Sequence, residues 1–374
     1  MSLFVNRNQH NTLKYDDVKQ KFGVDHPDMV SMWIADMDVS LPPVVSQALS
    51  EHASTGASGY QRSDISEAVQ HWYQLSGYTL AKDHILPAAG VVQSLFACVD
   101  ALTRPGSRIM VCSPVYGPFY SAVQHQQREL VTIGLMQRDG QYCIDFEALD
   151  PSASMLLLCN PNNPTGDVWD EPTLRRLSAF CRKHQIILVC DEVHRDFIFN
   201  NDPVSAVCLF DEPDNQVVVL NSAAKSFNLA GLGPASYVLA QNQKMRQTLL
   251  EYFTARHLAP ALPGAIALRA AYRHGQPWFS QVLSEIKANR QRVRSLQGAL
   301  PATLAIYLGQ GTYFAWLDAR KLGKNVKHVL LHEYHLALGD GAQFGQPGCF
   351  RLNLATHPDV IETVMSRLSH SARG

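Results

Sequence analysis

Four short apolar runs in the middle of the chain constrain its fold more than any other feature. They are RIMVC (108–112), MLLLC (155–159), IILVC (186–190) and VVVL (217–220). Near-continuous runs of this length are typical of strands buried on both faces. Helical patterns around 116–127 and 171–184 separate some of them, which predicts a parallel sheet covered by helices. Such a sheet binds ligands at the carboxyl ends of its strands.

The pattern changes from about Gln276, where a long amphipathic helix (277–299) begins. It is followed by strand-like TLAIYL and YFAWLD, a helix around 325–335, strand-like CFRLNLA and a helix at 358–370. This is typical of a smaller α+β domain. We predict an N-terminal arm with part of the small domain (1–45), a large domain (46–275) and a C-terminal small domain (276–374), since 374 residues exceed one small core.

Composition excludes several classes of protein. Hydrophobic residues make up 46% and charged residues 17%, and the net charge is −1, so neither nucleic acid nor an anionic membrane is an expected partner. No stretch is long and apolar enough for a membrane helix, and the N-terminus lacks a signal-peptide core. Eight cysteines form no CxxC pair, and several lie in apolar runs. We expect reduced, buried thiols and a cytoplasmic location.

Lys225 is the first candidate for chemistry. It is the only charged residue between Asp214 and Lys244, and its neighbours are apolar or small. Desolvation there would lower the pKa of the amine and make it a better nucleophile toward an aldehyde. The alternative is a lysine at a loop tip with its ammonium in water.

Asp191 follows the run IILVC directly, at the ligand end of the predicted sheet. A carboxylate there could keep the pyridinium nitrogen of pyridoxal 5′-phosphate (PLP) protonated, which is what makes PLP an electron sink. Opposite charges about 4 Å apart attract by roughly 4 kcal/mol at an effective dielectric near 20. The alternative is a helix N-cap.

Two further candidates also follow strand-like runs. Asn163 lies in NPNNPTG (160–166), a defined turn after MLLLC, where its amide could donate to the phenolate oxygen of PLP. Tyr116 lies in SPVYGPFY after RIMVC, where its ring could stack on a flat cofactor.

Charged groups of the substrate and cofactor need partners as well. Arg351 is the only acid or strong base between Asp340 and Asp359 and could bind a substrate carboxylate, or form an intramolecular salt bridge instead. The backbone amides of Val91 and Val92 open a predicted helix after Gly90 and could hold a phosphate.

These residues together resemble the fold-type I PLP enzymes of the aminotransferase class I/II superfamily. The matching residues are NPTG (163–166), Asp191 with His194, Ser222-Ala-Ala-Lys225, and Arg351 in FRLN. The chain more closely resembles the cystathionine β-lyase-like (MalY/PatB) carbon–sulfur lyases along nearly its whole length. The segments that carry this are MWIADMD (32–38), GYQRSD (59–64), PVYGPFY, LLLCNPNNPTG, DEVHRDF and AAKSFNLAGL.

The resemblance implies an α/β fold, with a mostly parallel seven-stranded sheet sandwiched by helices in the large domain and a smaller α+β domain. It implies that Lys225 binds the cofactor covalently, Asp191 faces the pyridine nitrogen, Asn163 and His194 lie near the ring and Tyr116 stacks on it. Ser222 and the amides of Val91 and Val92 hold the phosphate, with Tyr60 of a second subunit. Arg351 holds the substrate carboxylate, and Ala35 and Asp36 line the substrate entrance.

The predicted activity is cleavage of cystathionine or cysteine S-conjugates to a thiol, pyruvate and ammonia by a homodimer. The catalytic residues would be Lys225, Tyr116 and Asp191. Two alternatives stay open: an aminotransferase on the same scaffold, and a PLP-binding protein whose main role is to bind a regulatory protein. Gly233 stands where aminotransferases of the superfamily often have a phosphate-binding arginine, which favours the lyase branch. Ser226 stands where the lyases often have threonine.

Three histidines also have a spacing that can bind zinc. They are His328, His332 and His335, on the helix predicted around 325–335. The segment lacks the HExxH order, and fifteen histidines make chance spacing common, so we predict no metal site.

Overall fold

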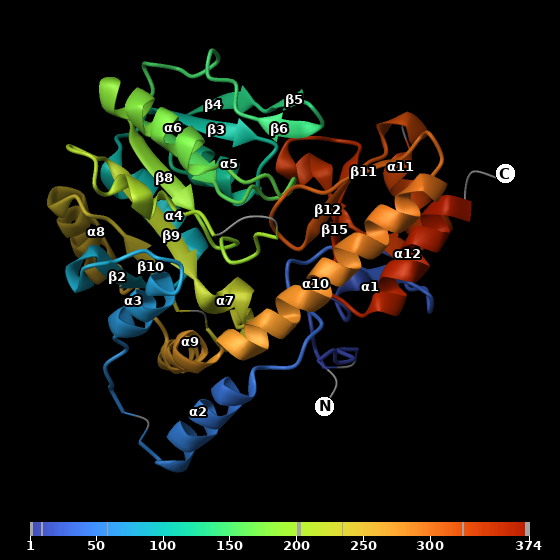
Figure 1. Cartoon of the computed structure of the whole chain (residues 1–374), viewed down its shortest axis with the longest axis horizontal. Helices are drawn as coiled ribbons and strands as arrows, with labels where there is room; N and C mark the ends of the chain where they lie inside the picture. The colour runs from blue at the N-terminus through green and yellow to red at the C-terminus, as the bar shows by residue number, and fades with distance from the viewer. Residues whose placement is uncertain are drawn as a thin grey trace.

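The computed structural model describes residues 3–8, 10–57, 59–199, 203–233, 235–323 and 325–370. Its largest sheet has seven strands in the order β2-β10-β9-β8-β7-β3-β4 (Figure 1). The strands are β2 (Ile85–Ala88), β3 (Arg108–Ser113), β4 (Glu129–Gly134), β7 (Met155–Cys159), β8 (Ile187–Asp191), β9 (Val217–Ser222) and β10 (Ser236–Leu239). Only β10 runs antiparallel to its neighbours. The predicted mostly parallel, seven-stranded sheet is confirmed.

Both faces of this sheet are buried, which explains the continuous apolar runs. In β7, Leu156 and Leu158 enter one core cluster and Leu157 enters the other. The first cluster is closed by α3 (Ser66–Gln74), α6 (Glu171–Lys183) and α9 (Leu262–His274). The second is closed by α4 (Val91–Leu102), α5 (Pro118–Gln124) and α8 (Gln243–Ala255). Successive side chains of a strand point to opposite faces, so both must be apolar when helices cover both.

A second, antiparallel sheet of four strands lies toward the C-terminus, in the order β11-β12-β15-β14. Its strands are β11 (Ala305–Tyr307), β12 (Phe314–Asp318), β14 (Gly339–Asp340) and β15 (Cys349–Asn353). A third core cluster joins it to α10 (Gln276–Leu296) and α12 (Pro358–His370). In Figure 1, α10 runs from α7 (Ala223–Ser226) and α9 to α12, and so connects the two sheets.

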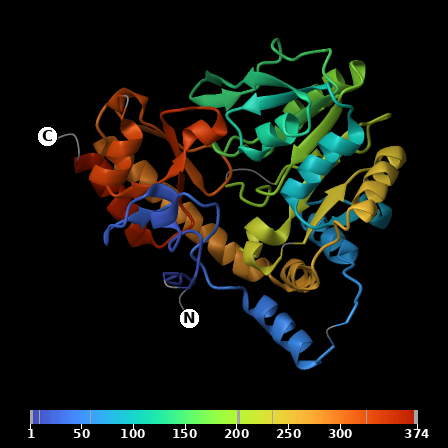
Figure 2. The ribbon, with the colours of Figure 1, turned by 180° about the vertical axis from the view of Figure 1, so that it is seen from behind.

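The N-terminal segment lies against the C-terminal part of the chain (Figure 2). Its short helix α1 (Val18–Phe22) is followed by β1 (Val30–Ser31), which pairs in parallel with β13 (Leu336–Ala337). The next helix, α2 (Pro43–Ser54), packs on α9 instead. The arm therefore pairs with a strand near the other end of the sequence, in a separate two-stranded sheet. The domain boundaries at 45/46 and 275/276 stay predictions.

The structure differs from the sequence prediction in the helix expected around 325–335. That segment has only α11 (Val326–His328) followed by one π-helical turn (Val329–Glu333).

All eight cysteines are unpaired and six are buried, as expected. In the described part of the chain, no helix is both long and apolar enough to cross a bilayer.

Candidate active site

Lys225 lies at the carboxyl end of β9, in the short helix α7. Ser222 caps this helix, because its Oγ accepts the amide hydrogen of Ala224 at 3.0 Å. The Lys225 side chain is half-buried, and its Nζ donates to the carbonyl oxygen of Ala35 at 2.7 Å. Burial, together with the positive charge of Arg351, lowers the pKa of Lys225 to about 8. A solvated loop-tip lysine is therefore the wrong interpretation.

Asp191 ends β8, the strand next to β9, and is 5% exposed. Its Oδ1 accepts the amide hydrogen of Val193 at 3.0 Å, in a turn that does not continue into a helix. Burial raises the pKa of Asp191 to about 6, against the lowering effects of that hydrogen bond and of Lys225. The parallel sheet thus brings a buried acid and a partly desolvated amine to the same edge.

Arg351 lies on β15 of the second sheet and is buried. Its Nη1 donates to Asn163 Oδ1 at 2.9 Å and its Nη2 to the carbonyl oxygen of Trp33 at 3.0 Å. Its Nε is buried without a hydrogen-bond partner among the described residues. The guanidinium carbon lies 4.2 Å from the ring centroid of Phe314 and 4.9 Å from that of Phe344. Burial lowers the pKa of Arg351 to about 10.

The contacts of Arg351 argue against the alternative that this residue forms an intramolecular salt bridge. Within the described residues, Arg351 has no ion pair with a carboxylate, and its two contacts are to neutral oxygens. A buried guanidinium in that position calls for a negatively charged partner from outside the chain. Its bond to Asn163 also occupies the amide oxygen of that residue, which leaves the Nδ2 hydrogens to donate elsewhere.

Tyr116, Ala35, Lys225 and Arg351 all line one cavity of about 440 Å³. Burial raises the pKa of Tyr116, so its hydroxyl stays protonated at neutral pH. His194 is buried outside that lining, 5.5 Å and 5.2 Å from the ring centroids of Tyr313 and Phe314. Burial and the charges of Lys225 and Arg351 lower the pKa of His194 well below its ordinary value, and its Nδ1 has no described partner.

Val91 and Val92 begin α4, a twelve-residue helix whose N-cap, Gly90, has no side chain to accept their amide hydrogens. The first amides of such a helix can bind an anion. Ser222, predicted to share the phosphate, donates its hydroxyl hydrogen to the carbonyl oxygen of Ala235 at 2.7 Å. That hydroxyl would have to rotate to donate to a phosphate. Tyr60 is fully exposed, on the extended connection between α2 and α3.

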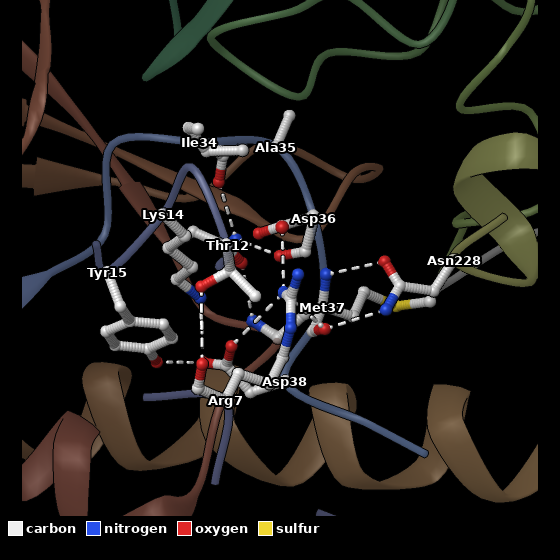
Figure 3. A network of polar contacts seen from close by, with 12 residues as sticks. Arg7, Thr12, Lys14, Tyr15, Ile34, Ala35, Asp36, Met37, Asp38 and Asn228 are labelled. Atoms are coloured by element: carbon white, nitrogen blue, oxygen red, sulfur yellow. Dashed lines mark hydrogen bonds and ion pairs between the residues drawn. The ribbon is translucent and has the colours of Figure 1, made fainter. Parts of the chain in front are cut away.

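Side chains nearer the N-terminus hold the segment 32–38, as Figure 3 shows for residues 34–38. Arg7 Nη1 contacts Asp36 Oδ2 at 2.7 Å. Asp38 Oδ2 accepts hydrogen bonds from Lys14 Nζ and from the Tyr15 hydroxyl, each at 2.7 Å. The side chain of Asp36 is therefore paired with Arg7 and is not part of the cavity lining, whereas its neighbour Ala35 lines the cavity.

The same segment is held from the other side by Asn228, three residues after Lys225. Asn228 Oδ1 accepts the amide hydrogen of Met37 at 3.0 Å, and its Nδ2 donates to the Met37 carbonyl oxygen at 2.8 Å. The Tyr313 hydroxyl donates to the Ala35 carbonyl oxygen at 3.0 Å. The carbonyl that holds Lys225 is thus fixed by contacts on both sides.

Several residues of the site have no place in the sequence prediction. Trp33 and Phe344 line the cavity beside Arg351, and Tyr313 shares the Ala35 carbonyl with Lys225. Trp33 lies in the MWIADMD segment, which was a usable signal. The two lysines at the cavity, Lys21 and Lys327, lie in short polar stretches that carry no such signal.

Comparison with known proteins matches the family model "Aminotransferase class I and II" to residues 27–368. The chain is 30% identical to cystathionine β-lyase PatB of Bacillus subtilis, over 96% of this chain and 97% of that protein. It is 26% identical to protein MalY of Escherichia coli, over 96% and 95% of the two chains. The crystal structure of cystalysin from Treponema denticola, which contains a pyridoxal 5′-phosphate cofactor, matches 99% of this chain and 97% of its own with a TM-score of 0.93 and 26% identity. The chain therefore belongs to the aminotransferase class I and II family.

Proposed function

We propose that this protein is a PLP-dependent carbon–sulfur β-lyase, which cleaves cystathionine or cysteine S-conjugates to a thiol, pyruvate and ammonia. The observation that carries the proposal is the amine of Lys225, with a pKa of about 8, beside a buried acid and a buried guanidinium. The name of its relative PatB, cystathionine β-lyase, supports the choice of reaction.

The residues at the sheet edge fit the cofactor. The buried carboxyl of Asp191 would face the ring nitrogen, and the Nδ2 hydrogens of Asn163 would donate to the phenolate oxygen. The amides of Val91 and Val92 would hold the phosphate, and Tyr116 would cover the ring. When bound, PLP supplies a positively charged ring that draws electrons from the α-carbon of the substrate.

Arg351 is the residue we propose for the α-carboxylate of the substrate. Among the described residues, its Nε has no hydrogen-bond partner and its guanidinium forms no ion pair, and a carboxylate that binds in the cavity would supply both. Charge-assisted hydrogen bonds to a guanidinium are short and directional, so they fix the orientation of the amino acid. The aromatic rings of Phe314 and Phe344 hold the guanidinium plane in place.

Lys225 is the residue we propose for moving the α-proton. A base works best when its pKa lies near the working pH, and the pKa of about 8 meets this condition. The carbonyl of Ala35 accepts the hydrogen bond of the amine and so directs it into the cavity. Tyr116 lines the same cavity with a protonated hydroxyl, which can donate a proton to the departing sulfur.

The experiment is a pyruvate assay with purified holoenzyme and L-cystathionine, without a keto-acid acceptor. We expect pyruvate from the wild type and none from Lys225→Ala. The wild type should also show an absorption band near the visible edge that borohydride abolishes, and Lys225→Ala should lack it. Pyruvate that appears only with an acceptor would support an aminotransferase instead. Capture of a transcription factor regardless of Lys225 would support the regulatory role.

We also propose a homodimer in which Tyr60 reaches the phosphate end of the neighbouring subunit. The complete exposure of this tyrosine supports the proposal, because its ring and hydroxyl are accessible to a second subunit. Mixing inactive Lys225→Ala with inactive Tyr60→Ala under subunit exchange should restore part of the activity, since some mixed dimers have one intact site. No recovery would place Tyr60 outside the neighbouring site.

We further propose a cytoplasmic location and the three-part division of the chain. The unpaired cysteines, six of them buried, support the first. The two separate sheets and the third core cluster support the second. Cell fractionation tests the location, and limited proteolysis near 45/46 and 275/276 tests the division of the chain.

A further inference from the structure

The cavity at Lys225 has an outer part that the proposed chemistry does not use. It is lined by Lys21 of α1, Lys327 of α11, and Asp340, which caps the turn at Gly341–Phe344. Lys327 Nζ contacts Asp340 Oδ2 at 2.9 Å, while Asp340 Oδ1 accepts the amide hydrogen of Ala342 at 3.0 Å. The carboxylate of this outer part is therefore already occupied on both oxygens.

Lys21 is left without such a partner. It forms no ion pair with any carboxylate in the described ranges, and its Nζ lies 5.6 Å from the ring centroid of Trp33. Two cations against one carboxylate leave the outer part with a net positive charge. An excess of positive charge beside an apolar wall favours a bound anion.

Trp33 contacts both Arg351, at the inner end of the cavity, and Lys21, at the outer end. Its carbonyl oxygen accepts from Arg351 Nη2 at 3.0 Å, while its ring lies under Lys21. The inner guanidinium and the outer ammonium are thus separated by the span of one residue. Arg351 and Lys21 line the same cavity, so a substrate held by Arg351 that extends past the sulfur reaches the side of Lys21.

We propose that Lys21, supported by Lys327, recognises a second carboxylate beyond the sulfur, so that the preferred substrates are thioether amino acids with a carboxylate at each end. This inference rests on the proposed lyase function. With Arg351 on the α-carboxylate, the outer carboxylate lies near Lys21 and leaves with the thiol. A distal group that carries an ammonium and no carboxylate is repelled by the same pair of lysines.

The test uses holoenzyme and three substrates of similar length: S-carboxyethyl-, S-propyl- and S-aminoethyl-L-cysteine. We expect kcat/KM to fall in that order, and the difference between the first and third to shrink in high salt, because the lysines are exposed. Lys21→Glu should lower kcat/KM for the carboxyethyl substrate by roughly fivefold or more, mainly through KM, and raise it for the aminoethyl substrate. The propyl substrate should be unaffected.

The matched control is Lys19→Glu. Lys19 lies on the same helix, is exposed and pairs with Asp25 at 2.8 Å, but does not line the cavity. Equal rates for the three substrates, or a Lys21→Glu variant that behaves like Lys19→Glu, would overturn the inference and leave the lyase function standing. Absence of pyruvate from all three substrates would overturn both.

Discussion

Replacement of Asp191 by asparagine should stabilise the cofactor-free protein while it abolishes activity. Burial raises the pKa of this carboxyl from 3.8 to about 6, so the folded protein holds its charged form at a cost. A shift of about 2 units at roughly 1.4 kcal/mol each gives a cost of about 3 kcal/mol once the carboxyl is ionised. Asparagine keeps the acceptor for the Val193 amide but carries no charge.

The pH dependence of this stabilisation follows from proton binding. The folded state binds the Asp191 proton more tightly than the unfolded chain, so this group favours folding most below pH 4 and loses that contribution as the pH rises through about 6. Asp191→Asn should therefore gain about 3 kcal/mol over the wild type at pH 8, and only about 1.5 kcal/mol at pH 5. Urea unfolding of both cofactor-free proteins, followed by far-ultraviolet circular dichroism, measures the two differences.

A control separates burial from the loss of any negative charge. Asp211→Asn removes an acid whose side chain is 72% exposed, and should change stability little at either pH. Saturating PLP should stabilise the wild type more than Asp191→Asn, because the protonated ring nitrogen compensates the buried carboxylate. A variant no more stable than the wild type at pH 8, or a gain of the same size at pH 5, would refute the reasoning.

Three further predictions concern the residues around Lys225. Lys14→Met removes the ammonium that pairs with the buried carboxylate of Asp38 and leaves only the weaker contacts of Tyr15 and Arg7. It should lower the free energy of unfolding by about 3 kcal/mol, measured with urea, while Lys14→Met/Asp38→Leu should recover part of it. Arg351→Lys should raise KM about tenfold with a smaller change in kcat in steady-state pyruvate assays, since lysine cannot grip a carboxylate bidentately. The rate at which PLP reacts with the cofactor-free protein should rise with a midpoint near pH 8, as Lys225 loses its proton, and Arg351→Met should move that midpoint upward in stopped-flow absorbance.

Within the seven-stranded sheet, the sequence predicted β3, β7, β8 and β9 and missed the edge strands β2 and β4 together with β10. β7 is apolar throughout, and β8 and β9 are apolar up to Cys190 and Leu220, because both their faces are buried. β4 lies at one edge, and most of its residues are partly or fully exposed, so its sequence ELVTIG mixes polar and apolar positions. β2, at the other edge, contains Pro87, and β10 has only four residues. Periodicity is weak in segments of this kind.

The residues of the site also divide into those that the sequence could bring together and those that it could not. Asn163, Asp191 and Lys225 could be placed together from the sequence, because parallel strands bring their carboxyl ends to one edge. The contact between Arg351 and Asn163 could not, since it depends on how the second sheet packs on the first. Lys21 and Lys327 are exposed lysines on short helices, and only tertiary packing brings them to the cavity.

The N-terminal arm is part of the active site through the carbonyl of Ala35. That carbonyl accepts both the Lys225 ammonium and the Tyr313 hydroxyl, and so must be held at one position for both bonds to form. Arg7 and Lys14 hold the acids on its C-terminal side (Figure 3). Lys14 is completely buried. Because the burial and hydrogen bond of Lys225 depend on this segment, residues about 200 positions earlier in the chain help to set the pKa of the proposed base. The arm must therefore be in place before the amine acquires the properties that its chemistry requires.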